Sequence, residues 1–445
     1  MSYDLHTYFT IGILAIAGIG LIYIWFKYFE TAVFFFALTP LISTIFFDNL
    51  PEETLVATEA TIGIGGTLRA IFLGILGAVG LIKFLLSIPR HKLKIPVHIV
   101  LLGIFILISL LSTFYSLDQK FTLIRSGLFT AVLGFLLGLY SWLKEDDANL
   151  EKTLNSLFVL VLIITFTTLA GLVLMPSRIW WWKLPRLVGL WEHPNTFGSF
   201  SMLAYPIILW KFYNSESSKR YFIIIPLLIT VIFHILTGSR TTLLASGIGV
   251  IVWLLLERDW IKLVVASVVI GTSVILLLNF SPKSFQRLES SDITDLSSRE
   301  DIWNSALIFI KEKPIQGYGF GVEGAIFQDE LKVDLEGSFI ERTVRQSLHN
   351  GYLSILVGGG FFGLILWIII LLLPLIFSFS TNFSPIKAYA VFTLLTVILT
   401  NFVESALTGY SKPTDIFFWL AWIILGIVWQ SDNKVNLKHT PESIS

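Results

Sequence analysis

Long apolar runs separated by short polar connections make up most of this chain. A helix needs about 20 predominantly apolar residues to cross the hydrocarbon core of a bilayer. Backbone polar groups in lipid must be paired within their own segment, so each such run is predicted to be an α-helix. By this criterion spans are predicted at 9–26, 31–47, 70–88, 96–114, 121–143, 154–175, 195–213, 221–237, 241–256, 261–279, 351–377, 387–407 and 415–430. The pattern predicts an all-α polytopic membrane protein with about 12–13 transmembrane helices.

One long polar segment, 281–348, interrupts this pattern. Ser297 or Ser298 can cap a helix there, and Pro314 is predicted to end it. The apolar face of this helix is predicted to hold four residues: Trp303, Ala306, Leu307 and Ile310. Gly317, Gly319 and Gly321 follow, and they allow turns with backbone conformations that residues with a Cβ atom rarely adopt. We expect a short amphipathic helix on the membrane surface, then an excursion that returns to His349.

Composition and charge agree with a membrane protein. Hydrophobic residues make up 55% of the chain and charged residues 14%, and the mean hydropathy is +0.78. The formal net charge of zero and the lack of a basic arm argue against binding to nucleic acid. The sequence contains no cysteine, which excludes disulfides and thiolate catalysis. Residues 1–9 lack the basic start of a signal peptide, so the first apolar run is expected to stay as a span.

Orientation follows from the distribution of lysine and arginine among the short loops. If the spans alternate, the basic loops share one side, which is predicted to be cytoplasmic: 89–94, Lys144, Lys152, Lys219, Arg220 and Arg258. The segment 281–348, with eight Lys/Arg and twelve Asp/Glu, then lies on the outer face. The N-terminus is external with 13 spans and internal with 12.

Several charged or titratable residues lie where the membrane makes them costly, since a central charge costs about 2.5–3.5 kcal/mol on insertion scales. Arg240 sits between two spans with almost no loop, Arg299 begins the loop helix, and Arg125 lies just inside a span. Each arginine could instead extend its charge to lipid headgroups. His349 could move protons at neutral pH or belong to a helix cap. His193, before Pro194 and Asn195, is typical of a helix entry, and Glu404 fits an interior salt bridge as well as a site.

Two other kinds of site are not supported by the sequence. The glycines of 317–324 do not follow a strand or open a βαβ unit, so a dinucleotide-binding loop is rejected. The seven histidines are scattered without metal-ligand spacing. Glu52-Glu53 is the one acidic pair near the first outer loop, where a metal-dependent enzyme of the GT-C class would need ligands, and no supporting ligand accompanies it.

Taken together, the motifs resemble the O-antigen ligase/polymerase family (Wzy-C, O-antigen ligase-like domain). The resemblance covers about residues 190–370 and rests on five pieces in order: Gly189-Leu190-Trp191-Glu192-His193-Pro194-Asn195, Thr237-Gly238-Ser239-Arg240-Thr241, Arg299 with Trp303, Ala306 and Leu307, Pro314 with Gly317, Gly319 and Gly321, and His349-Asn350 with Leu353, Leu356, Gly359 and Gly363. It implies a GT-C-like fold with an N-terminal transmembrane part (1–190), a ligase-like core (191–377) and a C-terminal part with a short cytoplasmic tail (378–445). One departure is Gly358-Gly359-Gly360, where the family pattern has Glu before a Gly.

The resemblance also implies a function. Members transfer an oligo- or polysaccharide from undecaprenyl pyrophosphate to a glycan, lipid or protein acceptor on the periplasmic face of the bacterial inner membrane. They need no metal or other cofactor. Arg240 and Arg299 would bind the pyrophosphate and His349 would be the catalytic base, with Asn350, His193 and Arg125 as further substrate-binding candidates.

The chemistry agrees with these roles, because guanidinium groups match phosphate oxygens and a neutral imidazole can accept the proton of an attacking hydroxyl. The sequence does not separate ligase from polymerase. An alternative within the family is a component of inorganic-carbon or other solute transport, for which paired charges within several spans would be expected.

Overall fold

The computed structural model describes residues 18–45, 64–91, 93–181, 185–279, 294–323, 348–378, 383–407 and 412–438. These residues are almost entirely helical, with a single isolated bridge between Trp180 and Leu187 in place of sheet. The helices are α2 (Phe29–Ile45), α3 (Ile64–His91), α4 (Val97–Leu111), η2 (Ser112–Phe114), α5 (Gln119–Glu145), α6 (Ala148–Leu174), α7 (Pro176–Ile179), α8 (Pro194–Tyr213), α9 (Ser217–Thr237), α10 (Arg240–Glu257), α11 (Trp260–Asn279), α12 (Thr294–Glu312), α15 (Gly351–Ser378), α16 (Pro385–Thr400) and α17 (Pro413–Lys438).

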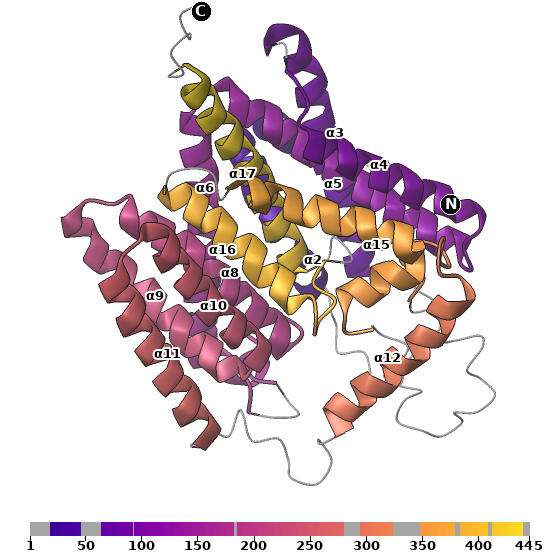
Figure 1. Cartoon of the computed structure of the whole chain (residues 1–445). Coiled ribbons are helices and arrows are strands. Elements are labelled where there is room, and N and C mark those ends of the chain that lie inside the picture. Colours follow the sequence, from indigo (N-terminus) through magenta and orange to yellow (C-terminus); the bar gives the residue numbers. More distant parts are fainter. Residues whose placement is uncertain are drawn as a thin grey trace, which may run out of the picture.

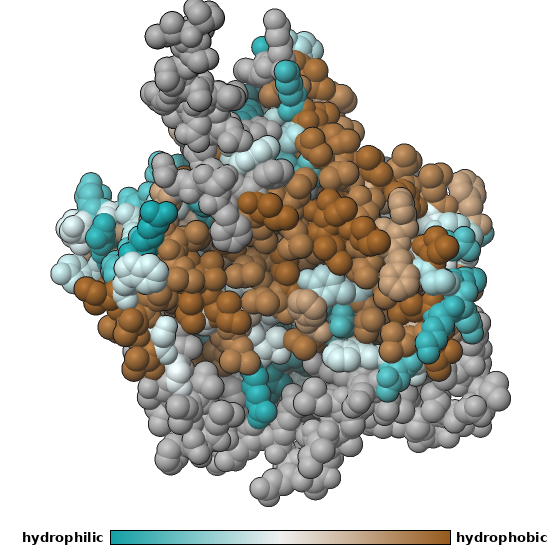
Figure 2. Space-filling view, in the orientation of Figure 1, coloured by the Kyte–Doolittle hydropathy of each residue, from teal (hydrophilic) through white to brown (hydrophobic). Residues whose placement is uncertain are grey.

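The outer surface of the bundle is apolar, as a bilayer requires. Figure 2 shows a broad brown band across the molecule, with hydrophilic residues toward its margins. Large apolar side chains on α9 and α11, such as Leu228, Ile232 and Val264, are more than half exposed. A monomeric water-soluble protein rarely exposes so continuous an apolar surface. The predicted class, an all-α polytopic membrane protein, is therefore confirmed.

The number of spans that the described helices support is smaller than the predicted 12–13. Seven of them are long and apolar enough to cross a membrane by length and composition. Helix Gly18–Lys27 and the following Phe29–Ile42 pass this test only as a pair, bent by 116° at their junction. The predicted spans 387–407 and 415–430 correspond to shorter apolar helices, Pro385–Thr400 and Pro413–Trp429. Part of the first predicted span, residues 9–17, lies outside the described residues.

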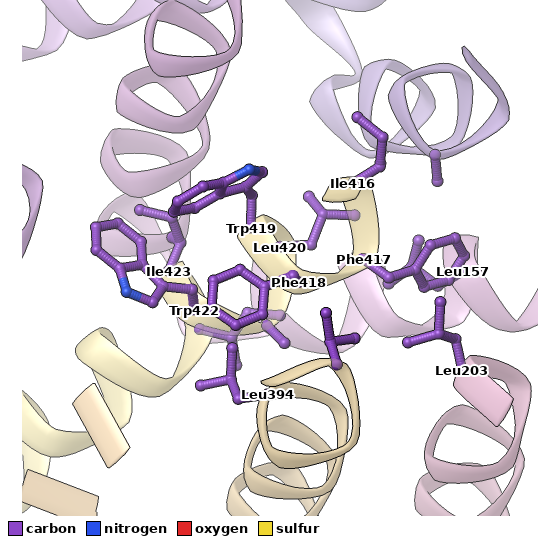
Figure 3. Packing of buried hydrophobic residues seen from close by; sticks show 14 of the residues in the cluster. Leu157, Leu203, Leu394, Ile416, Phe417, Phe418, Trp419, Leu420, Trp422 and Ile423 are labelled. Atoms are coloured by element: carbon purple, nitrogen blue, oxygen red, sulfur yellow. The ribbon is translucent and has the colours of Figure 1, made fainter. Parts of the chain in front are cut away.

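Helix α17 runs through the centre of the bundle. Its short apolar part is stable there because other helices surround it. Trp419, Trp422 and Phe418 are almost fully buried, and Figure 3 shows them among residues from neighbouring helices such as Leu157, Leu203 and Leu394. A helix that is apolar on every side belongs in a protein core or a membrane. Figure 1 shows α17 between α16 and the group formed by α3, α4 and α5.

Helix α15 is broken near its N-terminal end, and the glycine-rich turn predicted from the sequence packs against the break. Gly360 has φ 63° and ψ −169°, which divides the helix in two. Across the break, Phe361 donates its backbone N–H to the Pro314 carbonyl (2.8 Å), and Gly319 donates to the Gly358 carbonyl (2.9 Å). A Cβ atom at Gly360 would collide with the backbone of Ile315. Gly360 and Gly358, where a Cβ atom would lie 2.9 Å from the Gly319 carbonyl oxygen, therefore permit this close approach, whereas Gly359 has open space around it.

The three predicted turn glycines are confirmed as positions that favour glycine. Gly317, Gly319 and Gly321 have φ of 67°, 109° and 79°. Residues with a Cβ atom rarely adopt this region.

Helix α12 forms in the polar segment as predicted, but its limits and its buried face differ. It begins at Thr294 rather than after Ser297 or Ser298, and it ends before Pro314. The buried residues are Ile302, Ala306, Phe309 and Ile310, whereas Leu307 is 44% exposed. The prediction for Leu307 was wrong because the helix turns its Ile302 and Phe309 side toward α15, which it contacts (Figure 1). Residues 280–293 and 324–347 of the predicted segment lie outside the described residues.

Candidate functional site

His349 occupies the entrance of α15 in a conformation that residues other than glycine seldom adopt. Its φ is 47°, in the left-handed region. Asn350 caps the helix, since its side-chain oxygen accepts the backbone N–H groups of Tyr352 (3.0 Å) and Leu353 (3.1 Å). The capping function considered for His349 therefore belongs to Asn350. Unusual backbone geometry of this kind is typical of positions where the surrounding structure fixes a functional side chain.

The imidazole of His349 faces a carboxylate. His349 Nδ1 lies 3.6 Å from Glu404 Oε2, and the two side chains are 29% and 21% exposed. Glu404 lies just beyond α16, and its other oxygen accepts a hydrogen bond from Asn195 Nδ2 at 3.2 Å. A carboxylate beside one ring nitrogen can orient an imidazole and stabilise the charge it gains on protonation.

A buried arginine completes this arrangement. Arg186, 9% exposed, donates from Nη2 to Asn195 Oδ1 (2.7 Å) and from Nε to the Thr237 carbonyl (2.7 Å). Asn195 thus accepts from a cation and donates to Glu404. We call Arg186, Asn195, Glu404 and His349 the His349 network. It joins a loop, the start of α8, the end of α16 and the start of α15, four segments that are far apart in the sequence.

The same arginine connects the network to the turn between α9 and α10. Gly238 adopts the left-handed conformation (φ 62°), which closes α9 and lets α10 begin at once. Arg240 is the first residue of α10 and its side chain is exposed. Because Arg186 holds the Thr237 carbonyl three residues earlier, the structure brings the predicted Arg240 turn to the His349 network.

His193 lies beside the network and begins α8. Its Nδ1 accepts the backbone N–H of Asn195 at 3.1 Å, so its predicted place at a helix entry is confirmed. Burial lowers the pKa of His193 to about 4, and the positive charge of Arg186 adds to this effect. The ring is therefore neutral near pH 7 and can serve as the acceptor in the cap.

Lys412 adds a second positive charge near this end of the bundle. Its Nζ donates to the Ser405 carbonyl at 2.8 Å, directly after Glu404. Its charge is also among the causes that lower the pKa of His193. Arg186, Lys412 and the exposed Arg240 make this region suited to an anionic ligand.

Arg125, the remaining arginine predicted in a span, lies in a different environment. Its Nη1 is 2.9 Å from Glu323 Oε1, and its guanidinium lies 4.4 Å from the ring centre of Phe121. A Cβ atom at Gly321 would collide with the Arg125 side chain. Among the described residues, Arg125 thus contacts Glu323, Phe121 and Gly321 rather than the His349 network. A substrate-binding role for Arg125 stays a prediction.

Arg299 lies on α12, four residues before Trp303, and its side chain is outside the part of the chain that the structure describes. Trp303 donates from Nε1 to the Leu348 carbonyl at 2.9 Å. Helix α12 is therefore attached to the residue that precedes His349. This attachment places the helix that carries Arg299 next to the candidate site.

Four residues of the site were missed or left undecided by sequence analysis, among them Asn195, which was interpreted only as part of a helix entry. Arg186 and Lys412 were not considered. For Glu404, an interior salt bridge and a role in the site were equally compatible with the sequence. A signal existed for Arg186, because it follows Trp180-Trp181-Trp182-Lys183-Leu184-Pro185 between two predicted spans and a charge there needs a partner.

These observations define a class: a polytopic helical membrane protein with a histidine–carboxylate site and several cations where α8, α10, α15 and α16 meet. Residues 225–368 match the model of the family described as O-antigen ligase. This match agrees with the resemblance that the motifs indicated. The match includes Arg240, Arg299 and His349, whereas Arg186, Asn195 and Glu404 lie outside it.

Two curated relatives are similar over part of their length. An O-antigen ligase of Pseudomonas aeruginosa is 26% identical over 196 residues, covering 44% of each chain. A protein of Haemophilus influenzae described as uncharacterized is 29% identical over 205 residues, covering 42% of this chain and 50% of the relative. The chain therefore spans half or less of the curated relatives that it matches.

Proposed function

We propose that this protein transfers a glycan from undecaprenyl pyrophosphate to an acceptor hydroxyl at the periplasmic face of the bacterial inner membrane. The observation that carries the proposal is the His349 network: an imidazole 3.6 Å from a carboxylate, connected through Asn195 to a buried arginine. The match of residues 225–368 to the O-antigen ligase family supports it.

Arg240 and Arg299 hold the pyrophosphate of the donor in this proposal. As the bond between the sugar and the pyrophosphate breaks, its electron pair moves onto the leaving phosphate oxygen. A planar guanidinium can donate two parallel hydrogen bonds to phosphate oxygens as this charge develops. Arg186 is buried and already donates to Asn195 and Thr237, so it supports the site and does not contact the donor.

His349 accepts the proton of the acceptor hydroxyl. With Nδ1 turned to Glu404, Nε2 is the atom that takes this proton while the hydroxyl oxygen forms the new bond to the anomeric carbon. The imidazolium that results is stabilised by Glu404. One C–O bond forms and one breaks, the pyrophosphate keeps the electron pair of the broken bond, and the proton moves to His349, so the step balances without a redox partner.

The proposal is tested with purified protein, undecaprenyl pyrophosphate-linked glycan and an acceptor, in the presence of EDTA. Wild-type protein is expected to form product. His349→Ala is expected to lose about 10²–10⁴-fold in product formation while it still binds the donor, because general-base catalysis contributes about this much. Wild-type activity that disappears in EDTA, or a His349→Ala protein as active as wild type, would contradict the mechanism. Supplying either a core lipid or a second lipid-linked unit as acceptor separates ligase from polymerase.

The proposed location of the site has its own test. The chain contains no cysteine, so a single Asp334→Cys substitution places one thiol in the segment predicted to be periplasmic. An impermeant maleimide is expected to label it in bacteria whose outer membrane is permeabilised and whose inner membrane is intact. Labelling only after the inner membrane is lysed would place the segment in the cytoplasm and overturn the proposal.

A further inference from the structure

A second polar network lies buried behind the turn that carries Arg240. Tyr205 of α8, His234 of α9 and Thr242 of α10 are 8%, 0% and 1% exposed. Tyr205 Oη lies 2.9 Å from His234 Nδ1, and His234 Nε2 lies 2.8 Å from Thr242 Oγ1. We call these three residues the His234 network.

One tautomer of His234 gives every side-chain donor of the His234 network an acceptor. The Thr242 hydroxyl donates its one hydrogen to the Ser239 carbonyl at 3.1 Å, because a carbonyl can only accept. With this hydrogen on the Ser239 carbonyl, which also accepts the backbone N–H of Leu243 (3.1 Å), Thr242 Oγ1 accepts from the N–H at Nε2 of His234. Nδ1 then carries the lone pair and accepts the hydroxyl hydrogen of Tyr205. A neutral imidazole with its hydrogen on Nε2 satisfies all three side chains.

This network fixes the peptide group that leads into Arg240. The Ser239 carbonyl that Thr242 holds belongs to the peptide bond between Ser239 and Arg240. The N–H of Ser239 donates to Thr237 Oγ1 (3.2 Å), whose hydroxyl donates to the His234 carbonyl (2.6 Å). Both polar backbone groups of Ser239 are thus connected to His234, one through its ring and one through its backbone.

Close packing leaves this turn little room to move. A Cβ atom at Gly198 of α8 would lie 2.7 Å from Ser239 Cβ and 2.8 Å from Thr242 Oγ1. Protein interiors transmit small displacements because they are densely packed. A displacement of the Ser239 carbonyl would therefore change the direction in which the Arg240 side chain extends from the start of α10.

We propose that His234 is a positioning residue that, through Thr242 and the Ser239 carbonyl, holds Arg240 in the direction needed to bind the pyrophosphate of the donor. The proposal rests on the proposed function for the identity of the ligand. His234 is buried behind the turn and acts only through its neighbours. Among the described residues, the hydrogen bonds of the network lead to the turn before Arg240, so its loss should affect donor binding more than the chemical step.

The test compares Thr242→Val, which removes the hydroxyl and keeps the shape, with Thr242→Ser, which keeps the hydroxyl. Thr242→Val is expected to raise the KM for undecaprenyl pyrophosphate-linked glycan about tenfold with kcat changed less than about twofold, as the loss of a buried hydrogen bond suggests. Thr242→Ser should restore most of the affinity. Ser246→Ala, which removes a separate hydrogen bond one turn further along α10 (2.7 Å to the Thr242 carbonyl), should match wild type. An unchanged KM in Thr242→Val, or a loss confined to kcat, would overturn the proposal.

A second measurement does not depend on glycan transfer. Hydrogen exchange of the backbone across 237–243 is expected to accelerate about tenfold in Thr242→Val and not in Thr242→Ser, with exchange in α16 unchanged. Equal exchange in all three proteins would refute the positioning role even if transfer is confirmed. If exchange is faster in Thr242→Val than in wild type but the wild-type protein transfers no glycan, the proposed function is refuted and the positioning role of this turn is kept. Should Thr242→Val not fold, Tyr205→Phe is measured in the same way, with an expected effect of about threefold.

Discussion

A basic side chain near the start of a helix contacts a glutamate at two places in this molecule, Arg125 with Glu323 and His349 with Glu404. The two contacts differ in the residues that surround them. Arg125 and Glu323 form a close ion pair at 2.9 Å. The guanidinium also lies over Phe121 and against Gly321. Each of these contacts is of the kind that holds elements together, here α5 and the glycine-rich turn.

His349 and Glu404 make a looser contact, with 3.6 Å between Nδ1 and Oε2. Glu404 is also held by Asn195, and Asn195 by the buried Arg186. The carboxylate is thus fixed from behind while the imidazole in front of it stays partly exposed. The two glutamates therefore differ in the contacts behind the carboxylate more than in the ion pair itself, and this difference fits the proposed catalytic role of the His349 network.

The largest expected effect concerns the exposed arginine beside the His349 network. Arg240→Lys is expected to lose about 100-fold or more in glycan transfer, nearly as much as Arg240→Ala, because an ammonium cannot form the paired hydrogen bonds of a guanidinium. Transfer assays at matched protein levels check this. Near-normal transfer by Arg240→Lys would mean that Arg240 only reaches toward lipid headgroups.

A smaller loss is expected when the carboxylate is neutralised. Glu404→Gln should lower kcat about 10- to 100-fold, since it removes a charge 3.6 Å from Nδ1 whose attraction for the imidazolium is a few kcal/mol at an effective dielectric constant of about 20. Glu323→Gln is the matched control at the other glutamate and should leave kcat within about twofold. Equal losses in both variants would remove the distinction between the two sites.

The next expectation concerns stability and pH. Burial lowers the pKa of His193 to about 4, below the value of about 6.5 in an unfolded chain. Between these two values the unfolded state binds more protons, so stability should fall as the pH drops from about 6.5 to 4 and change little from this residue outside that window. His193→Asn keeps a cap acceptor and removes the titrating group. The free energy of unfolding, measured by thermal melting, should therefore change by about 1–2 kcal/mol less between about pH 6.5 and pH 4 than it does in wild type. Parallel pH profiles for the two proteins would contradict the neutral cap.

The smallest effect is expected at the structural pair. Arg125→Met should lower stability by about 0.5–1 kcal/mol, as partly exposed ion pairs do, and leave the KM for the lipid-linked donor unchanged. Thermal melting and initial rates measure the two quantities. A tenfold rise in KM would instead support the substrate-binding role that the sequence suggested for Arg125.

Much of the fold follows from the sequence, because apolar runs and helix caps are local signals. The runs predicted the helices, and His193-Pro194-Asn195 and Thr237-Gly238-Ser239-Arg240 predicted the start of α8 and the turn into α10. Hydropathy could not show that α17 is buried on all sides, since lipid and a protein core select the same residues. The buried face of α12 was mispredicted at Leu307 for a related reason, because the sequence of α12 does not specify that it packs against α15.

The candidate site was only partly predictable. His349 and Arg240 were recognisable by motif, whereas the contact of Asn195 with Glu404 joins residues 209 positions apart. No local pattern specifies a pairing over such a distance. Arg186 carried a weak signal as a charge among tryptophans, but its two acceptors, Asn195 and the Thr237 carbonyl, emerge only from the packing of α8 and α9.

A double-mutant cycle in the purified transfer assay shows whether Glu404 acts on catalysis through His349. The four proteins are wild type, Glu404→Gln, His349→Ala and the double variant, compared by product formation at saturating donor. If the two residues act as one unit, the double variant should be no slower than His349→Ala alone, because residues of a catalytic unit are not additive. Losses that multiply, with the double variant a further 10- to 100-fold slower, would show that Glu404 acts independently of His349 and would contradict the account.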